Sequence, residues 1–180
     1  MTCPGCGAGA VRSVPEVCAD PDSVRTDLAD RLAKAPAVTP RGDSLLHGVE
    51  GLCLVAVGVA LAVMGMRDGS AVYTAGGWLL AVVMLAGTVV VVRNEARERA
   101  VVAAGGSAAD RLWSPARYCP ACTSVFCAGG EPWEGLLTPE QFQKLVWTEA
   151  GYGRQLEEKV QSAAVPTGIL PGRGGAQEHA

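Results

Sequence analysis

Four of the seven cysteines stand in two Cys-x-x-Cys pairs, Cys3 with Cys6 and Cys119 with Cys122. This spacing lets one tight turn present two thiolates to the same ion, and two such turns complete a tetrahedral zinc site. Gly7 follows the first pair, where the chain often needs a left-handed backbone conformation, and Thr123 takes that position after the second. The sequence therefore predicts one four-cysteine metal site. Zinc is the preferred ion, and iron uses the same all-thiolate shell.

The two pairs are far apart in sequence, with 112 residues between Cys6 and Cys119, whereas about 15 to 20 separate the halves of an ordinary site of this kind. Two long apolar runs, residues 45–66 and 69–92, lie in this interval. A polar turn at residues 67–70 joins them, so two helices connected this tightly must be antiparallel. Such a hairpin returns the chain to its starting side and lets the two cysteine pairs meet.

The apolar runs have the length expected of membrane-spanning helices. Residues 69–92 form 24 positions without a charge, more than the roughly 20 that cross a hydrocarbon core. The uncharged part of the first run, residues 51–66, is 16 positions long and would cover only about 24 Å as a helix. We interpret the pair as a transmembrane hairpin. The alternative is a buried helical hairpin, for which the chain has too little other apolar surface.

Basic residues near the apolar runs predict the orientation of the hairpin. Cytoplasmic flanks carry the excess of Lys and Arg, and only Arg67 lies in the short turn between the runs. The remaining basic residues lie outside the hairpin: Arg31, Lys34 and Arg41 before it, and Arg93, Arg97, Arg99 and Arg111 after it. The first 30 residues contain no cleavable signal peptide. We therefore expect a multi-pass protein of the cell (inner) membrane with both termini in the cytoplasm.

The segments Thr2-Cys3-Pro4-Gly5-Cys6-Gly7 and Tyr118-Cys119-Pro120-Ala121-Cys122 resemble the two halves of a zinc ribbon. The resemblance covers about 25 residues and implies a structural zinc site without an open coordination position, in a bacterial membrane protein whose ribbon is split around the hairpin. Closing a long loop costs only about 0.6 kcal/mol per doubling of its length, whereas structural zinc contributes about 10 kcal/mol or more. The alternative is that the pairs bind metal in trans, in a homo-oligomer.

The other cysteines are Cys18, Cys53 and Cys127. Cys53 lies in the first apolar run, where a small apolar packing role is expected. Cys127 follows Cys122 by five residues and is an alternative ligand for the second pair. An odd number of cysteines disfavours a complete disulfide framework, and a reducing cytoplasm disfavours it further.

Glu50 is the residue of the first run that most disfavours membrane insertion, because placing a carboxylate at the centre of a bilayer costs about 2.5 kcal/mol or more. Counted from the turn it lies near the level of Arg93, and we expect these two side chains to pair at the inner headgroup boundary. The alternative is that His47, Glu50 and Cys53, which share one side of the helix, form a second metal site or a proton relay. Small residues at close spacing could let the two helices approach closely: Gly58 with Ala62, Ala56 with Ala60, and Gly77 with Ala81.

The fold class that follows is a mainly α membrane protein with a transmembrane helical hairpin, a small cytoplasmic zinc-ribbon-like module and short soluble helices. Its segments are a first knuckle (1–18), a cytoplasmic helix and linker (19–44), the hairpin (45–92, with spans 45–66 and 71–92), a charged helix and linker (93–117), a second knuckle (118–130), a C-terminal helical region (131–163) and a flexible tail (164–180).

Local signals refine three of these helices. Asp20 as N-cap and Pro21 at the first helical position predict a helix over residues 19–36, with an apolar stripe that includes Val24. The helix after the second span is expected to break at Gly105-Gly106. Thr138 and Gln141 form a capping-box pattern that predicts a helix from Pro139 to about Ala150. The apolar face of this last helix holds Phe142, Leu145, Val146 and Trp147, which we expect to be packing surface.

Composition and net charge limit the classes of function that the sequence supports. The net charge of −3 and pI near 5.4 offer no global attraction to nucleic acid. Only two histidines are present, and neither a Ser-His-Asp set nor a Gly-rich phosphate loop occurs, so we expect no enzyme. The predicted function is that of an adaptor or scaffold, whose metal module and helix 139–150 contact a cytoplasmic protein partner. Two alternatives stay open: a membrane-anchored thiol-disulfide redox protein and a membrane-tethered nucleic-acid-binding regulator.

Overall fold

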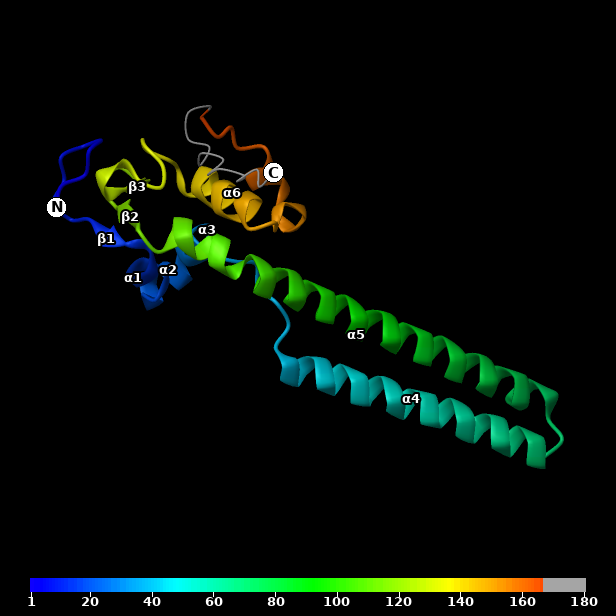
Figure 1. The fold of residues 1–180 in the computed structure, drawn as a ribbon. Helices are drawn as coiled ribbons and strands as arrows, with labels where there is room; N and C mark the ends of the chain where they lie inside the picture. The colour runs from blue at the N-terminus through cyan, green and yellow to red at the C-terminus, as the bar shows by residue number, and fades with distance from the viewer. Residues whose placement is uncertain (167–180) are drawn as a thin grey trace, which may run out of the picture. The chain divides into compact units, whose positions relative to one another are not determined.

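The computed structural model describes residues 1–166, which divide into two compact units (Figure 1). The cysteine unit combines Met1–Pro36 with the chain from Val102 onward, and the hairpin unit is Ala37–Val101. The fold is mostly helical, with one small three-stranded sheet. Residues 167–180 of the expected C-terminal tail lie outside the described residues. Each unit is built from its own contacts.

The hairpin unit consists of two long helices, α4 (Arg41–Arg67) and the first part of α5 (Ala71–Trp113). Both are long and apolar enough to cross a membrane. Only 17% of the most apolar stretch of α4 and 11% of that of α5 is buried, whereas the core helix of a soluble protein is mostly buried. Both apolar runs of the sequence are therefore helical, and each helix extends beyond the bounds expected for it.

Glycines on α4 set the contact between the two helices. Gly51 faces Thr88, Gly58 faces Ala81 and Gly65 faces Thr74. The paired numbers move in opposite directions, so the helices are antiparallel, as expected (Figure 1). A Cβ on Gly58 would lie 2.7 Å from the backbone nitrogen of Ala81. The helices thus approach so closely that no side chain fits between them at these positions.

The contact between α4 and α5 at Gly51, Gly58 and Gly65, called the seam below, determines which of the predicted small residues lie between the helices. Gly58, Ala62, Gly77 and Ala81 are buried in it, as predicted, but Ala56 and Ala60 are exposed. The reason is a seven-residue repeat on α4, Gly51, Gly58 and Gly65, which keeps one narrow stripe against the partner helix. Ala56 and Ala60 fall on another side of the helix. The expectation for that pair was wrong.

The sheet of the cysteine unit joins the beginning of the chain to its second half. Strand β1 (Arg12–Ser13) pairs antiparallel with β2 (Ala116–Cys119), which pairs antiparallel with β3 (Ser124–Cys127). Leu137 exchanges two backbone hydrogen bonds with Val125 of β3, at 2.7 and 2.9 Å. The outer edge of β3 is therefore partly covered, and the second cysteine pair lies at the turn between β2 and β3.

Short helices replace the single helix expected over residues 19–36. Helices α2 (Pro21–Arg25) and α3 (Leu28–Arg31) lie in this range, and α1 (Val14–Cys18) precedes it. Asp20 caps α2 and Pro21 begins it, as predicted, but Asp27 has φ 55° and breaks the helical path. Aspartate tolerates this left-handed conformation better than most residues. Val24 of the predicted stripe is 60% exposed as a result.

Helix α5 does not break at Gly105-Gly106 but continues to Trp113. Gly105 is buried, and a Cβ there would overlap the carbonyl oxygen of Ala150 and lie 2.6 Å from the Tyr152 ring. The Tyr152 hydroxyl donates to the carbonyl of Val102, at 2.7 Å. This glycine therefore permits close packing inside the cysteine unit rather than ending the helix.

Helix α6 (Pro139–Glu149) has the predicted bounds and the predicted capping box between Thr138 and Gln141. Its apolar face is buried in the cysteine unit: Phe142 is 0%, Leu145 3%, Val146 0% and Trp147 7% exposed. Gly151 follows with φ 82° and ends the helix. The chain continues through the 3-10 turn η2 (Gly153–Gln155) and α7 (Glu158–Gln161). A further 3-10 turn, η1 (Ala128–Gly130), follows β3.

The N-terminal helices are held to the rest of the cysteine unit by contacts that do not involve the two cysteine pairs. The indole N–H groups of Trp113 and Trp147 donate to the carbonyls of Leu32 and Ala33, at 2.8 and 2.9 Å. Arg31 lies 2.7 Å from the carboxylate of Glu140 on α6. Residues 14–33 are thus docked by their own contacts and residues 12–13 by strand pairing, so that residues 1–11 depend most on the cysteines.

Candidate metal centre

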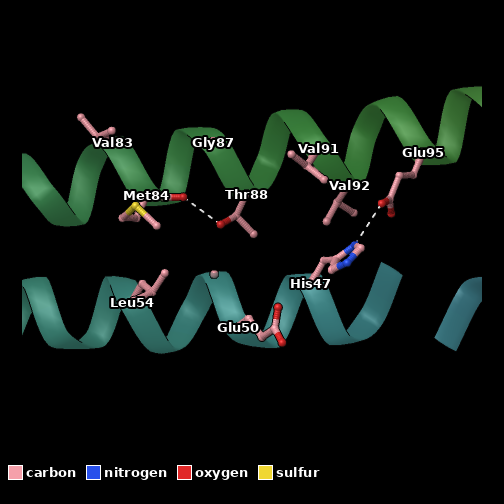
Figure 2. Close-up of a pocket in the computed structure, with 11 residues that line it drawn as sticks. His47, Glu50, Leu54, Val83, Met84, Gly87, Thr88, Val91, Val92 and Glu95 are labelled. Carbon is pink, nitrogen blue, oxygen red and sulfur yellow. Dashed lines mark hydrogen bonds and ion pairs between the residues drawn. The ribbon is translucent and has the colours of Figure 1, made fainter. Parts of the chain in front are cut away.

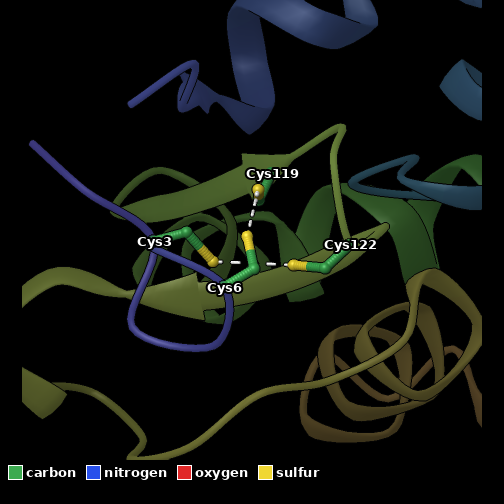
Figure 3. A group of neighbouring side chains, drawn as sticks. All are labelled: Cys3, Cys6, Cys119 and Cys122. Carbon is green, nitrogen blue, oxygen red and sulfur yellow. Dashed lines mark hydrogen bonds between the residues drawn. The ribbon is translucent and has the colours of Figure 1, made fainter. Parts of the chain in front are cut away.

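The four cysteines of the two Cys-x-x-Cys pairs converge on one point (Figure 3). All four sulfur atoms lie within 4.8 Å of one another. The Cys3 and Cys122 sulfurs are 3.6 Å apart, and so are those of Cys6 and Cys119. The closest partners therefore belong to opposite halves of the chain, and a single chain supplies the complete set.

The arrangement fits a tetrahedral metal ion. Zinc–sulfur bonds of about 2.3 Å place neighbouring sulfurs of a tetrahedral site about 3.8 Å apart. The 3.6 Å separations are close to that value, whereas the sulfurs of a disulfide lie about 2.05 Å apart. All seven cysteines are free. The donor set and its spacing thus suit one ion held by four thiolates.

The two knuckles use the same backbone device. Gly7 has φ 72° and Thr123 has φ 52°, so each chain turns back through a left-handed residue directly after its second cysteine. In the first knuckle the Gly7 N–H donates to the Cys3 carbonyl and the Cys3 N–H to that of Ala8, both at 2.9 Å. The expected role of Gly7 is confirmed. This conformation costs a non-glycine residue about 1–2 kcal/mol, and Thr123 adopts it nonetheless.

One side of the cluster is covered and the other is open. Cys3 is 2% and Cys119 0% exposed, while Cys6 is exposed and Cys122 partly so. Phe126, itself 2% exposed, packs against the two buried cysteines. An apolar cover on one side restricts water around those thiolates. The open side offers a path by which a metal ion can enter and leave.

Hydrogen bonds set unequal proton affinities for the sulfurs of the metal-free cluster. A hydrogen bond from Ser124 and others from the neighbouring thiols lower the pKa of Cys122 to about 7. The backbone N–H of Ala8 lowers the pKa of Cys6, but hydrogen bonding with Cys122 and the other thiols outweighs it and raises that pKa to about 12. Near neutral pH the cluster therefore retains protons that a metal ion must displace.

We expect metal affinity to rise with pH for this reason. Each proton displaced on binding changes the apparent affinity by about tenfold per pH unit. Because Cys6 keeps its proton at neutral pH, at least one proton should leave as zinc binds, and acid should favour release of the metal. Competition with a zinc chelator at pH 6, 7 and 8 measures the slope. An affinity that stays constant over this range would contradict the expectation.

Cys127 does not belong to the cluster, although sequence spacing offered it as an alternative ligand. Successive side chains of a strand point to opposite faces, and Phe126 faces the cluster. Cys127 is 8% exposed, and its burial raises its pKa to about 12. Burial likewise raises the pKa of Cys18 to about 11. Both side chains are thus favoured as neutral thiols.

The expected pairing of Glu50 with Arg93 is wrong. Among the residues that the structure describes, Glu50 forms no salt bridge. The carboxylate of Glu95 on α5 instead lies 3.2 Å from Nδ1 of His47 (Figure 2). It also accepts a hydrogen bond from Ser44 of α4. The antiparallel seam brings Glu95, one turn beyond the apolar run, level with the beginning of α4. Sequence reasoning did not single out Glu95 or Ser44.

The alternative grouping of His47, Glu50 and Cys53 also fails as a metal site. Over residues 1–166, the four cysteines form the one cluster of potential ligand side chains close enough to share an ion. His47 turns to Glu95 (Figure 2), and Cys53 is exposed. Helical spacing places these three residues on one side of α4, but their side chains do not converge.

Comparison with known proteins adds no family. The chain matches no protein-family model, and no curated protein and no solved structure is similar to it.

Proposed function

We propose that this protein is a membrane-anchored, non-enzymatic adaptor whose cysteine unit is stabilised by one structural zinc ion and docks a cytoplasmic protein partner. The observation that carries the proposal is the convergence of four sulfurs to within 4.8 Å of one another. Two of them precede the apolar hairpin in the sequence and two follow it. A metal ion there ties the beginning of the chain to the strands that follow the hairpin.

The donor set favours a structural role for the metal. Catalytic zinc sites keep one coordination position open for water or substrate, whereas structural sites are closed by four protein ligands. Here Cys3, Cys6, Cys119 and Cys122 together fill the tetrahedron. A closed shell leaves no position for a reacting molecule, which supports an adaptor over a metalloenzyme.

Membrane anchoring is supported by the two helices of the hairpin unit. Large apolar side chains cover the outer faces of α4 and α5: Leu46, Leu52, Val57, Val72, Leu79 and Val82 are each more than half exposed. A contiguous apolar surface of this extent is costly in water. A lipid bilayer removes that cost, and the basic flanks support an orientation with both ends of the hairpin on the cytoplasmic side.

Besides helix α6, the cysteine unit offers a second surface that suits a partner. Helix α6 was the expected contact element, but its apolar face forms the core of the cysteine unit. Within residues 1–166, the large apolar side chains that this unit exposes are Met1, Val24 and Leu136, at 65%, 60% and 38%. Met1 and Leu136 line one hollow beside the first knuckle, of about 650 Å³, together with Glu134. We place the partner contact there, with an apolar side chain flanked by a basic group as the complementary chemistry.

Metal analysis combined with labelling tests the proposal. Protein purified in detergent should contain about one zinc per chain, and a membrane-impermeant amine reagent applied to intact cells should leave Lys144 and Lys159 unlabelled. Label on either lysine would place the cysteine unit outside the cell and overturn the cytoplasmic adaptor. Counting free thiols before and after oxidation distinguishes the adaptor from a redox protein. Oxidation of the cysteines that leaves zinc fully bound would favour the redox protein over a structural site.

A further inference from the structure

A groove of about 530 Å³ lies between α4 and α5 within the hairpin unit (Figure 2). Its volume is in the range of small-molecule sites, roughly 300–1,000 Å³. The groove is polar at one end, where His47, Glu50 and Glu95 line it, and apolar at the other, where Leu54 and Val83 line it. This gradient is the pattern that an amphiphile presents, with a polar head and an apolar chain.

The length of the groove matches one half of a bilayer. Its lining on α5 extends from Val83 to Glu95, and twelve residues of helix cover about 18 Å. A single leaflet contributes about 15 Å of hydrocarbon. If the hairpin crosses the membrane as proposed, the polar end of the groove lies at the headgroup boundary and the apolar end near the bilayer centre.

The charges at the polar end select the head group. Glu95 is engaged by Ser44 and His47, and Arg99 donates to Ser44 and to the carbonyl of Thr39. Glu50 has no salt-bridge partner within residues 1–166. An ionised carboxylate near hydrocarbon is costly unless a cation or hydrogen-bond donor meets it. A primary ammonium supplies both.

Space for a chain is provided by Gly87, which lines the groove on α5. A Cβ on Gly87 would meet no atom within 4 Å, so the position is not required for the contact between the helices. Gly76, on the same helix, is equally open but lies outside the groove lining. Gly87 therefore leaves a gap that the seam itself does not need.

We propose that this groove binds one phospholipid with a primary-ammonium head group, phosphatidylethanolamine, whose ammonium donates to Glu50 while an acyl chain lies against Leu54, Val83 and Gly87. The inference rests on the membrane anchoring in the proposed function and not on the metal site. It gives the hairpin a preference among lipids in addition to its role as an anchor.

Native mass spectrometry of the zinc-loaded, full-length protein tests the proposal. Phosphatidylethanolamine, phosphatidylcholine and phosphatidylglycerol with identical acyl chains are titrated separately, and the first bound lipid is counted. We expect phosphatidylethanolamine to bind about tenfold more tightly than the other two, because only its head group donates charged hydrogen bonds to a carboxylate. Glu50→Gln should remove this preference, and Glu98→Gln, an exposed change outside the groove, should keep it.

Gly87 and Gly76 supply a second test, which does not depend on charge. Gly87→Leu should fill the groove and weaken binding of all three lipids by about tenfold, while Gly76→Leu should bind as the wild type does. Equal affinity for the three lipids, tightest binding of phosphatidylglycerol, or equal binding by the two leucine variants would overturn the proposal. Resistance of the wild-type protein to alkaline extraction from membranes is measured in parallel. If that resistance is present, a negative lipid result refutes the lipid site alone.

Discussion

Cys119→Ser is expected to reduce bound zinc from about one ion per chain to nearly none. Cys119 is fully buried, and its sulfur lies 3.6 Å from that of Cys6. Serine is a poor zinc ligand compared with a thiolate, and the loss of one of four ligands opens the shell. Structural zinc binding contributes about 10 kcal/mol or more, so a substitution of one of the four ligands should have a larger effect than one elsewhere in the cysteine unit. Metal analysis of the purified variant measures it.

The structural consequence of Cys119→Ser should be confined to residues 1–11 and the turn that carries Cys119 and Cys122. Residues 14–33 keep their contacts through the Trp113 and Trp147 indoles and the Arg31–Glu140 ion pair. Hydrogen exchange followed by mass spectrometry should therefore show faster exchange over residues 1–11 and little change over residues 14–33. Loss of protection over both ranges would contradict this division of the unit.

Cys127→Ser is the matched control, because it alters a buried cysteine of strand β3 that lies outside the cluster. This variant should keep its zinc. If Cys127→Ser lost the metal and Cys119→Ser retained it, the ligand set would have to include Cys127 and the proposed site would be wrong.

Gly77→Val is expected to separate the two helices of the hairpin unit. A Cβ at Gly77 would overlap the backbone of Ala62 and lie 2.6 Å from the carbonyl oxygen of Gly58. Both obstacles are backbone atoms, which cannot rotate away. Overpacking costs about 1–3 kcal/mol even where side chains can adjust, so the loss here should be at least that large. Titration of detergent-solubilised protein with sodium dodecyl sulfate, followed by hydrogen exchange in α4 and α5, measures it.

Gly76→Val provides the control for this experiment at the neighbouring position. A Cβ at Gly76 would meet nothing within 4 Å, yet the change in helix propensity and apolarity is identical. Equal denaturation midpoints for Gly76→Val and Gly77→Val would show that the seam does not hold the hairpin together. Zinc content should be the same in both variants.

The cysteine cluster could be predicted from sequence because its signal is chemical and its topology is simple. Two Cys-x-x-Cys pairs define the ligands, and two apolar runs indicate how the chain returns. The sheet could not be predicted, since β1 contains two residues and β2 and β3 four each, too few to show the alternation that identifies a strand. The pairing of Arg12 with Tyr118 depends on contacts across the whole chain.

The wrong predictions share one physical cause. At these positions tertiary contacts, and not the local sequence, determine the structure. Gly105 suggested a helix break, but the carbonyl of Ala150 needs the space that its missing side chain leaves. Glu50 suggested an ion pair with Arg93, but the register of the seam brings Glu95 to His47 instead. That register follows from three glycines of α4 spaced seven residues apart, a pattern hidden in sequence by the abundance of Gly and Ala.

The joining of β1 to β2 has a consequence for biosynthesis. Cys3 and Cys122 are 119 positions apart, and a ribosome adds about 5 to 20 residues each second. The N-terminal thiols therefore wait roughly 6 to 24 s for their partners to be translated. During this interval they are an incomplete pair, open to oxidants and to competing ions. An ion that needs all four thiolates could therefore be captured only in the later part of translation or after its completion.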